Sequence, residues 1–373
     1  MRTSKRLQAH RLSKRWVAVR LYLAAMLLLA VAACAVPSST PEATLTVTGA
    51  TECTPTLPQE GPITEPYLTL VESFDLVAPS GHRIYGLIRW PDPATYPDLC
   101  FPAVVMVPGG INPGRMMAEG QEVRLLAEAG MVVLTFNAEG RVDDVPQDIA
   151  SEGTEDHNGF RHQDGLCAIV QYAIDLDYVI PDNVGIKTQS YGITMGVGCA
   201  ARHPEIPIKY IVDGEGPSES FVTCHEPLSL DADPNNDKVE LVYGIMGHYS
   251  TYRDSSPENL NFWEEREALR FIGDFRGRYL RLQAEWDHAQ PPSSVAEIPT
   301  FTQPPLWWHN KHATDMVNAA LAGGVPWVRV NLPEQGNPVN TIFDMQHRPV
   351  YLPGELADAQ WGVRAVLEMA RMP

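Results

Sequence analysis

The sequence predicts an α/β fold, with a mostly parallel central sheet and helices on both faces. Two short, continuous apolar runs, "FPAVVMVPGG" at 101–110 and "MVVLTFN" at 131–137, are typical of strands that are buried on both faces. Between them, "AEGQEVRLLAEAG" at 118–130 has helical spacing and ends at a glycine. Strands that alternate with helices in this way indicate parallel strands joined by crossover helices.

The alternation continues to the end of the chain. Two extended runs at 67–79 and 82–90, separated by a Pro-Ser-Gly turn, predict an antiparallel hairpin before it. The later apolar runs predict strands at 183–189, 208–214, 278–287 and 326–332, and helices at 164–176, 192–204, 313–324 and 356–372. The stretch 216–277 interrupts the rhythm with aromatic, charged and turn residues and a partly helical pattern. We interpret it as an inserted cap at the carboxyl edge of the sheet.

The first 33 residues have the pattern of a signal peptide. Residues 1–20 carry seven basic residues and no acidic residue, and the apolar run at 21–33 is short for a membrane span. The sequence "VAAC", which ends at Cys34, resembles the lipobox of bacterial lipoproteins, in which the cysteine carries the lipid. We therefore expect a lipoprotein anchored through Cys34 that faces the extracytoplasmic side. An uncleaved anchor or a plain signal peptide is the alternative.

A Thr- and Pro-rich segment follows the signal peptide. Residues 34–66 hold few large apolar side chains, so they bury too little surface to offset the entropy of ordering. We expect a tether there, and a single large domain at 67–373.

Composition argues against two kinds of site. The chain has 28 Lys+Arg against 46 Asp+Glu, so it has no excess of cations for the phosphates of a nucleic acid. No two cysteines have CxxC spacing, which gives no support to a zinc or redox site. Export permits disulfides, but the spacing does not determine the pairing. The six cysteines are Cys34, Cys53, Cys100, Cys167, Cys199 and Cys224.

Several polar residues and glycines follow the ends of predicted strands. Gly109 and Gly110 come after one strand, Ser190 and Asp287 follow two others, and His347 lies beyond the last. In an open parallel sheet, ligands bind beyond the carboxyl ends of the strands. The chain order serine, aspartate, histidine is that of a catalytic triad on this kind of sheet.

With these residues in this order, the chain from about Tyr67 to Pro373 resembles an α/β hydrolase. It is most similar to the dienelactone-hydrolase and prolyl-oligopeptidase-like groups. The resemblance implies a serine hydrolase that cleaves an ester or amide of a small molecule or peptide and needs no cofactor. Ser190 would be the nucleophile, His347 the base, and Asp287 the residue that orients the base.

The resemblance also assigns an oxyanion hole. Its donors would be the backbone N–H of Tyr191 and that of Gly110 or Ile111. Gly192 supplies the small residue that a tight strand-to-helix turn needs. The usual pattern also has a glycine two residues before the serine, where this chain has Thr188. This departure places a larger side chain where the pattern packs tightly.

Alternatives stay open for two members of the triad. Asp213 also ends a predicted strand and is the alternative to Asp287. His312, and after it His288, are the alternatives to His347. A second reading of the whole chain is a binding lipoprotein that keeps this fold without catalysis.

Two further clusters contain metal-ligand residue types. The sequence "EDHNGFRHQDG" at 155–165 matches no closed zinc motif, and we interpret it as a polar loop at the rim of the site. The sequence "DADPNND" at 231–237 resembles the start of a calcium loop but lacks its glycine and its final glutamate. We expect no metal site.

Overall fold

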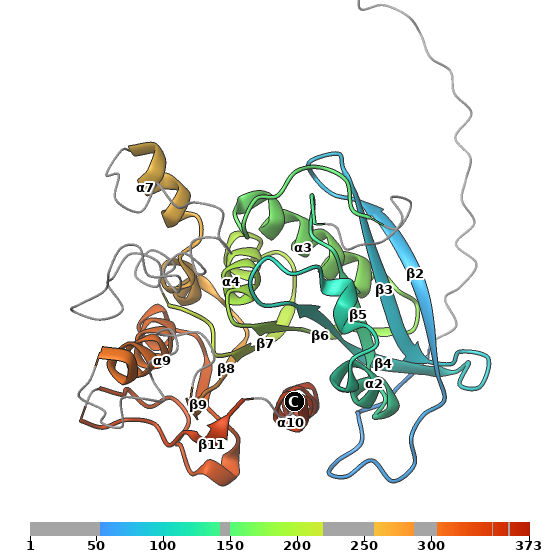
Figure 1. Ribbon diagram of the computed structural model, residues 1–373. Helices are drawn as coiled ribbons and strands as arrows, with labels where there is room; N and C mark the ends of the chain where they lie inside the picture. Colours follow the sequence, from blue (N-terminus) through green and yellow to red (C-terminus); the bar gives the residue numbers. More distant parts are fainter. Residues whose placement is uncertain (1–52, 142–149, 219–256, 287–303, 345, 357–358) are drawn as a thin grey trace, which may run out of the picture. The chain divides into compact units, whose positions relative to one another are not determined.

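A computed structural model describes the part of the chain that contains the predicted sheet (Figure 1). The described residues are 53–141, 150–218, 257–286, 304–344, 346–356 and 359–373. The predicted signal peptide at 1–33, the roles of Cys34, Asp287 and His288, and the cluster at 231–237 lie outside them.

The sheet is mostly parallel, as predicted. In spatial order its strands are β10 (Trp327–Val330), β8 (Arg278–Leu282), β7 (Ile208–Gly214), β6 (Val179–Gln189), β4 (Leu99–Val107), β5 (Val132–Phe136), β3 (Arg83–Pro91) and β2 (Thr69–Val77). β2 and β3 form the predicted antiparallel hairpin, and β3 is also antiparallel to β5. The other neighbours in this order run parallel, which brings their carboxyl ends to one edge.

Helices cover both faces of the sheet (Figure 1). α2 (Gln121–Glu128) and α10 (Ala359–Arg371) contribute to one hydrophobic cluster. α3 (Phe160–Ile174), α4 (Gly192–Arg202) and α9 (Pro304–Gly323) contribute to the other. Within the described residues, no helix is long and apolar enough to cross a membrane.

The period of two along β4 explains why the sheet needs both layers. Ala103 and Val105 join the cluster under α3 and α4, whereas Val104 and Met106 join the cluster under α2 and α10. Successive side chains of a strand point to opposite faces, so a continuous apolar run must be covered twice.

The strand predicted at 278–287 is divided in two. β8 ends at Leu282, and β9 (Ala284–Trp286) pairs instead with β11 (Leu352–Glu355). The cause is Asn331, whose side-chain amide bonds both the N–H and the carbonyl of Gln283. These bonds replace the next step of the ladder between β8 and β10. The predicted helix at 313–324 also begins earlier, at Pro304.

Residues 257–274 of the predicted insertion are mostly helical. They contain α7 (Pro257–Glu264), α8 (Ala268–Phe271) and the 3-10 turn η4 (Ile272–Asp274). Elsewhere in the described part of the chain, 3-10 turns form η1 (Gly114–Met117) and η6 (Pro333–Gln335).

The domain begins before residue 67. Cys53 forms a disulfide with Cys100, and β1 (Thr54–Pro55) pairs with the start of β4. Residues 53–66 of the segment predicted as a tether are therefore attached to the sheet at this point. Composition alone did not reveal this, because the attachment depends on a cysteine that is distant in sequence.

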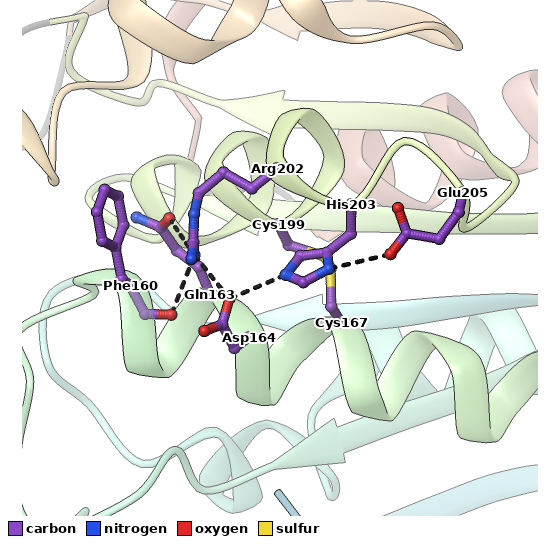
Figure 2. Close-up of a disulfide and its surroundings, with 8 residues drawn as sticks. All are labelled: Phe160, Gln163, Asp164, Cys167, Cys199, Arg202, His203 and Glu205. Carbon is purple, nitrogen blue, oxygen red and sulfur yellow. Dashed lines mark hydrogen bonds and ion pairs between the residues drawn. A yellow bond between two sulfur atoms is a disulfide. The ribbon is translucent and has the colours of Figure 1, made fainter. Parts of the chain in front are cut away.

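A second disulfide, Cys167–Cys199, joins α3 to α4 (Figure 2). Beside it, the Asp164 carboxylate forms an ion pair with the Arg202 guanidinium (2.7 Å) and lies 2.9 Å from the His203 ring. The disulfide and this ion pair connect the same two helices. The helix that begins just after Ser190 is thus held to its neighbour both covalently and electrostatically.

Candidate active site

Ser190 occupies a tight turn between β6 and α4. β6 ends at Gln189 and α4 begins at Gly192, so only two residues reverse the chain. Ser190 has φ 48°, in the left-handed region that residues with a side chain seldom adopt. Its N–H donates to the carbonyl of Gly214 at the end of β7 (2.7 Å). A strained strand-to-helix turn of this kind is where hydrolases of this architecture hold their nucleophile.

Two glycines allow the turn to lie against the end of β4. A Cβ at Gly192 would lie 2.5 Å from the carbonyl oxygen of Pro108, which a real side chain does not tolerate. A Cβ at Gly109 would lie 3.2 Å from the Cβ of Ser190. The segment after β4 therefore lies directly beside the serine. Gly110 (φ 59°) and Ile111, the second source of the predicted oxyanion hole, follow in the same segment.

Thr188 fits because a glycine in the helix faces it. A Cβ at Gly196 would lie 2.6 Å from the Cγ2 of Thr188, so the threonine methyl occupies the space that Gly196 leaves. The small residue that the pattern demands in the strand is supplied by α4 instead. The Oγ1 of Thr188 is buried and has no hydrogen-bond partner within the described residues.

The stretch 155–165, predicted to be a polar loop, is a loop only up to Gly159, because α3 begins at Phe160. Residues 155–158 of this loop contact the turn that holds Ser190. The Asn158 side-chain amide donates to the carbonyl of Tyr191 (3.0 Å), and the Tyr191 hydroxyl donates to the carbonyl of His157 (3.0 Å). Both loop residues have positive φ, 47° at His157 and 63° at Asn158. The only sequence signal for this role was an excess of polar residues before a helix.

Arg141 holds the same loop from β5's side. Its guanidinium makes two hydrogen bonds to the carboxylate of Glu155 (3.0 and 3.1 Å) and one to the amide oxygen of Asn158 (2.5 Å). Burial alone would raise the pKa of Glu155, but the hydrogen bond and charge of Arg141 lower it below its usual value. The carboxylate is therefore ionised at neutral pH and the pair stays charged.

His162 is a buried, neutral member of this network. Its Nε2 lies 2.9 Å from the carbonyl of Glu139, and its Nδ1 accepts from the N–H of Asn158 (3.3 Å). Burial, and next the charge of Arg141, lower the pKa of His162 to about 4. A cationic guanidinium amid these groups disfavours a metal ion. Within the described ranges, no group of three His, Cys, Asp or Glu residues could hold one.

Asp213, the alternative acid, is fully engaged by its neighbours. Its Oδ2 accepts from Arg281 (2.8 Å) and from the Tyr279 hydroxyl (2.5 Å), and its Oδ1 accepts from the N–H of Gly216 (2.9 Å). Both members of the Asp213–Arg281 ion pair are fully buried. This arrangement uses the carboxylate to join β7 to β8, and none of these three partners is a histidine.

His347 lies on the loop between β10 and β11. Its side chain is 80% exposed, and its Nδ1 is 3.3 Å from the Asp344 carboxylate. Backbone N–H groups of His347 and Gln346 lower the pKa of Asp344. Within the described residues no hydrogen bond joins His347 to Ser190, so the structure does not bring this predicted pair together.

His312, the alternative base, has a different serine as its partner. Its Nδ1 accepts from the N–H (3.0 Å) and lies 2.8 Å from the hydroxyl oxygen of Ser218. Both residues are buried. The contact connects α9 to the segment after β7, and the hydroxyl that His312 contacts there is that of Ser218.

Comparison with solved structures agrees with this architecture. A puromycin-hydrolyzing peptidase from Mycobacterium tuberculosis matches 82% of this chain with a TM-score of 0.54 and 15% sequence identity. A puromycin hydrolase matches 83% of it with a TM-score of 0.53 and 15% identity. This chain has the α/β-hydrolase fold. It covers only 39% and 40% of those two chains. No protein-family model matches it, and no curated protein is significantly similar in sequence.

The close approach of Gly196 to Thr188 predicts that substitutions at these two positions have coupled effects on stability. Gly196→Ala should lower the free energy of unfolding by about 1–3 kcal/mol, because its methyl group would overlap that of Thr188. In a Thr188→Ala background the same change should cost much less. Chemical denaturation of the two single variants and the double variant measures this. Equal costs in both backgrounds would show that the two side chains do not compete for space.

The buried His162 predicts a stability that falls in acid. Its pKa is about 4 when folded and near 6.5 in an unfolded chain, so the unfolded state binds more protons between these values. Stability should therefore decrease as the pH falls from 7 towards 4. His162→Gln should reduce this loss, measured as the shift in Tm between pH 7 and pH 5. If the variant keeps the full wild-type shift in Tm, His162 is not a source of the stability loss in acid.

Proposed function

We propose that this protein is an exported serine hydrolase that cleaves a carboxylic ester or amide through an acyl-enzyme intermediate. The observation that carries the proposal is the left-handed turn that holds Ser190 between β6 and α4. The α/β-hydrolase fold and the glycines that pack this turn against the end of β4 support it. A turn with this strain persists only where surrounding contacts hold it, and such strain is concentrated at functional sites.

In the proposed reaction, the Oγ of Ser190 attacks the substrate carbonyl and its proton passes to His347. The negative charge on the carbonyl oxygen is stabilised by the N–H of Tyr191 and that of Gly110 or Ile111. His347 then protonates the leaving group, and water hydrolyses the acyl-enzyme by the same steps in reverse order. The chemistry requires no cofactor.

The reaction requires the loop that carries His347 to move. Asp287 follows the last residue of β9 and would orient the imidazole. The loop that carries His347 has to bring its ring from Asp344 to Ser190. Catalytic hydrogen bonds are often loose without substrate and tighten when it binds.

The substrate class of the proposal is a small ester or a peptide. Two proteins with this fold are a puromycin-hydrolyzing peptidase and a puromycin hydrolase, which supports including a peptide substrate and puromycin in the test. p-Nitrophenyl esters, peptide anilides and puromycin form the panel that separates these possibilities.

A non-catalytic binding lipoprotein is the second candidate. The exposed ring of His347, 80% open to solvent and bonded to Asp344, is the observation that favours it. On this reading the fold binds a ligand at the same edge of the sheet without an acyl-enzyme.

Ser190→Ala should abolish hydrolysis of whichever panel member the wild type cleaves, with a loss of at least about a thousandfold in kcat. The reason is that no other hydroxyl takes the place of the nucleophile. His347→Gln should cause a comparable loss. Ser80→Ala is the matched control. Ser80 lies in the turn of the β2–β3 hairpin, where its hydroxyl donates a hydrogen bond to Glu139, and this variant should keep full activity. A wild-type protein that cleaves nothing and does not react with a fluorophosphonate would favour the binding lipoprotein.

Export with a lipid at Cys34 is part of the proposal. The two disulfides among the described residues support export, because disulfides persist in oxidising compartments. Cys34→Ala should move the protein from the detergent phase to the aqueous phase in Triton X-114 partitioning of the producing bacteria. Equal partitioning of variant and wild type would contradict the lipid anchor.

A further inference from the structure

A buried arginine from the described end of the insertion contacts the loop that holds Tyr191. Arg266 follows α7, and its side chain is 3% exposed. Its Nε–H donates to the carbonyl of His157 (3.1 Å), and its Nη2 donates to the carbonyl and the carboxylate of Asp156 (2.6 and 3.1 Å). A third nitrogen donates to the carbonyl of Phe262, whose ring lies 3.7 Å from the guanidinium carbon.

The carbonyl oxygen of His157 is shared by two donors. It accepts the Nε–H of Arg266 and the hydroxyl of Tyr191 (3.0 Å). On the other side of the same residue, Asn158 donates to the carbonyl of Tyr191. The carbonyl oxygen of His157 therefore links Arg266 to Tyr191, whose backbone N–H is the proposed oxyanion donor.

The loop needs an external hold because it is strained. His157 and Asn158 are consecutive residues with positive φ, a conformation that costs free energy for residues with a side chain. A Cβ at Gly159 would lie 2.2 Å from the Nη2 of Arg266, so the guanidinium packs directly against the loop backbone. A buried cation is tolerated only where its N–H groups are matched by acceptors, and this loop supplies three of them.

We infer that Arg266 is a positioning residue of the oxyanion hole. It fixes the carbonyl of His157, which in turn fixes Tyr191 and the direction of its N–H. Arg266 touches no reacting atom, so it acts on turnover through this chain of contacts. The segment that carries α7 thereby affects the rate of the reaction as well as the surroundings of the substrate. The inference rests on the proposed hydrolase activity.

Arg266→Ala tests the inference, with Arg270→Ala as its control. Arg270 lies on the same segment but pairs with Glu264 at an exposed position. For the panel substrate that the wild type cleaves, Arg266→Ala should lower kcat about ten- to a hundredfold, as expected for a small misplacement of catalytic groups. KM should change less than about threefold. Millimolar guanidinium should restore part of the rate to Arg266→Ala only, whereas Arg270→Ala should keep the wild-type kcat and show no such response.

A double variant separates positioning from simple loss of stability. Tyr191→Phe removes the hydroxyl that shares the His157 carbonyl and should also lower kcat. If both residues act through that oxygen, the loss of kcat in the double variant should be little larger than the loss in the less active of the two single variants. Multiplied losses, or a wild-type rate of fluorophosphonate labelling in Arg266→Ala, would overturn the inference alone. A wild type without Ser190-dependent labelling would overturn the proposed function, and this inference with it.

Discussion

The hydrogen bond from the N–H of Ser190 to the carbonyl of Gly214 is the contact on which the site depends. It ties the turn after β6 to the end of β7 while Ser190 holds a left-handed conformation that costs about 1–3 kcal/mol. The turn stays in place because Gly192 and Gly109 let the end of β4 pack against it. The disulfide between α3 and α4 then fixes the helix that continues from the turn.

Buried charges stabilise the loops on either side of this turn. Asp213 and Arg281 join β7 to β8, and Arg141 holds Glu155 before α3. The Asp213–Arg281 pair is fully buried, whereas the Glu155 carboxylate keeps partial contact with solvent. Burying a charge costs free energy, and hydrogen bonds to the charged groups offset that cost. The rigidity that results is the kind that preorganised donors require, because an oxyanion hole works only where its N–H groups do not have to reorient. Arg266 extends the same principle to the inserted segment.

The strands and most helices were predictable from the sequence because apolar periodicity reflects burial directly. The place of Ser190 was predictable for the same reason, since it follows a buried strand. Other features depend on contacts between distant segments, and no local pattern reports them. Four features are of this kind: the space that Gly196 leaves for Thr188, the cysteine pairings, the departure of β9 from the main sheet, and the contact of His157 with Tyr191. The roles of His347 and Asp287 stay predictions.

Peptide mapping of protein treated with diisopropyl fluorophosphate tests the central claim most directly. An activated serine forms a covalent phosphoryl adduct, whereas a serine in an ordinary turn does not. The account predicts one adduct, on the peptide that contains Ser190, formed in the folded protein and absent after unfolding. An adduct at another residue, or none in folded protein, would contradict the claim that this turn activates Ser190.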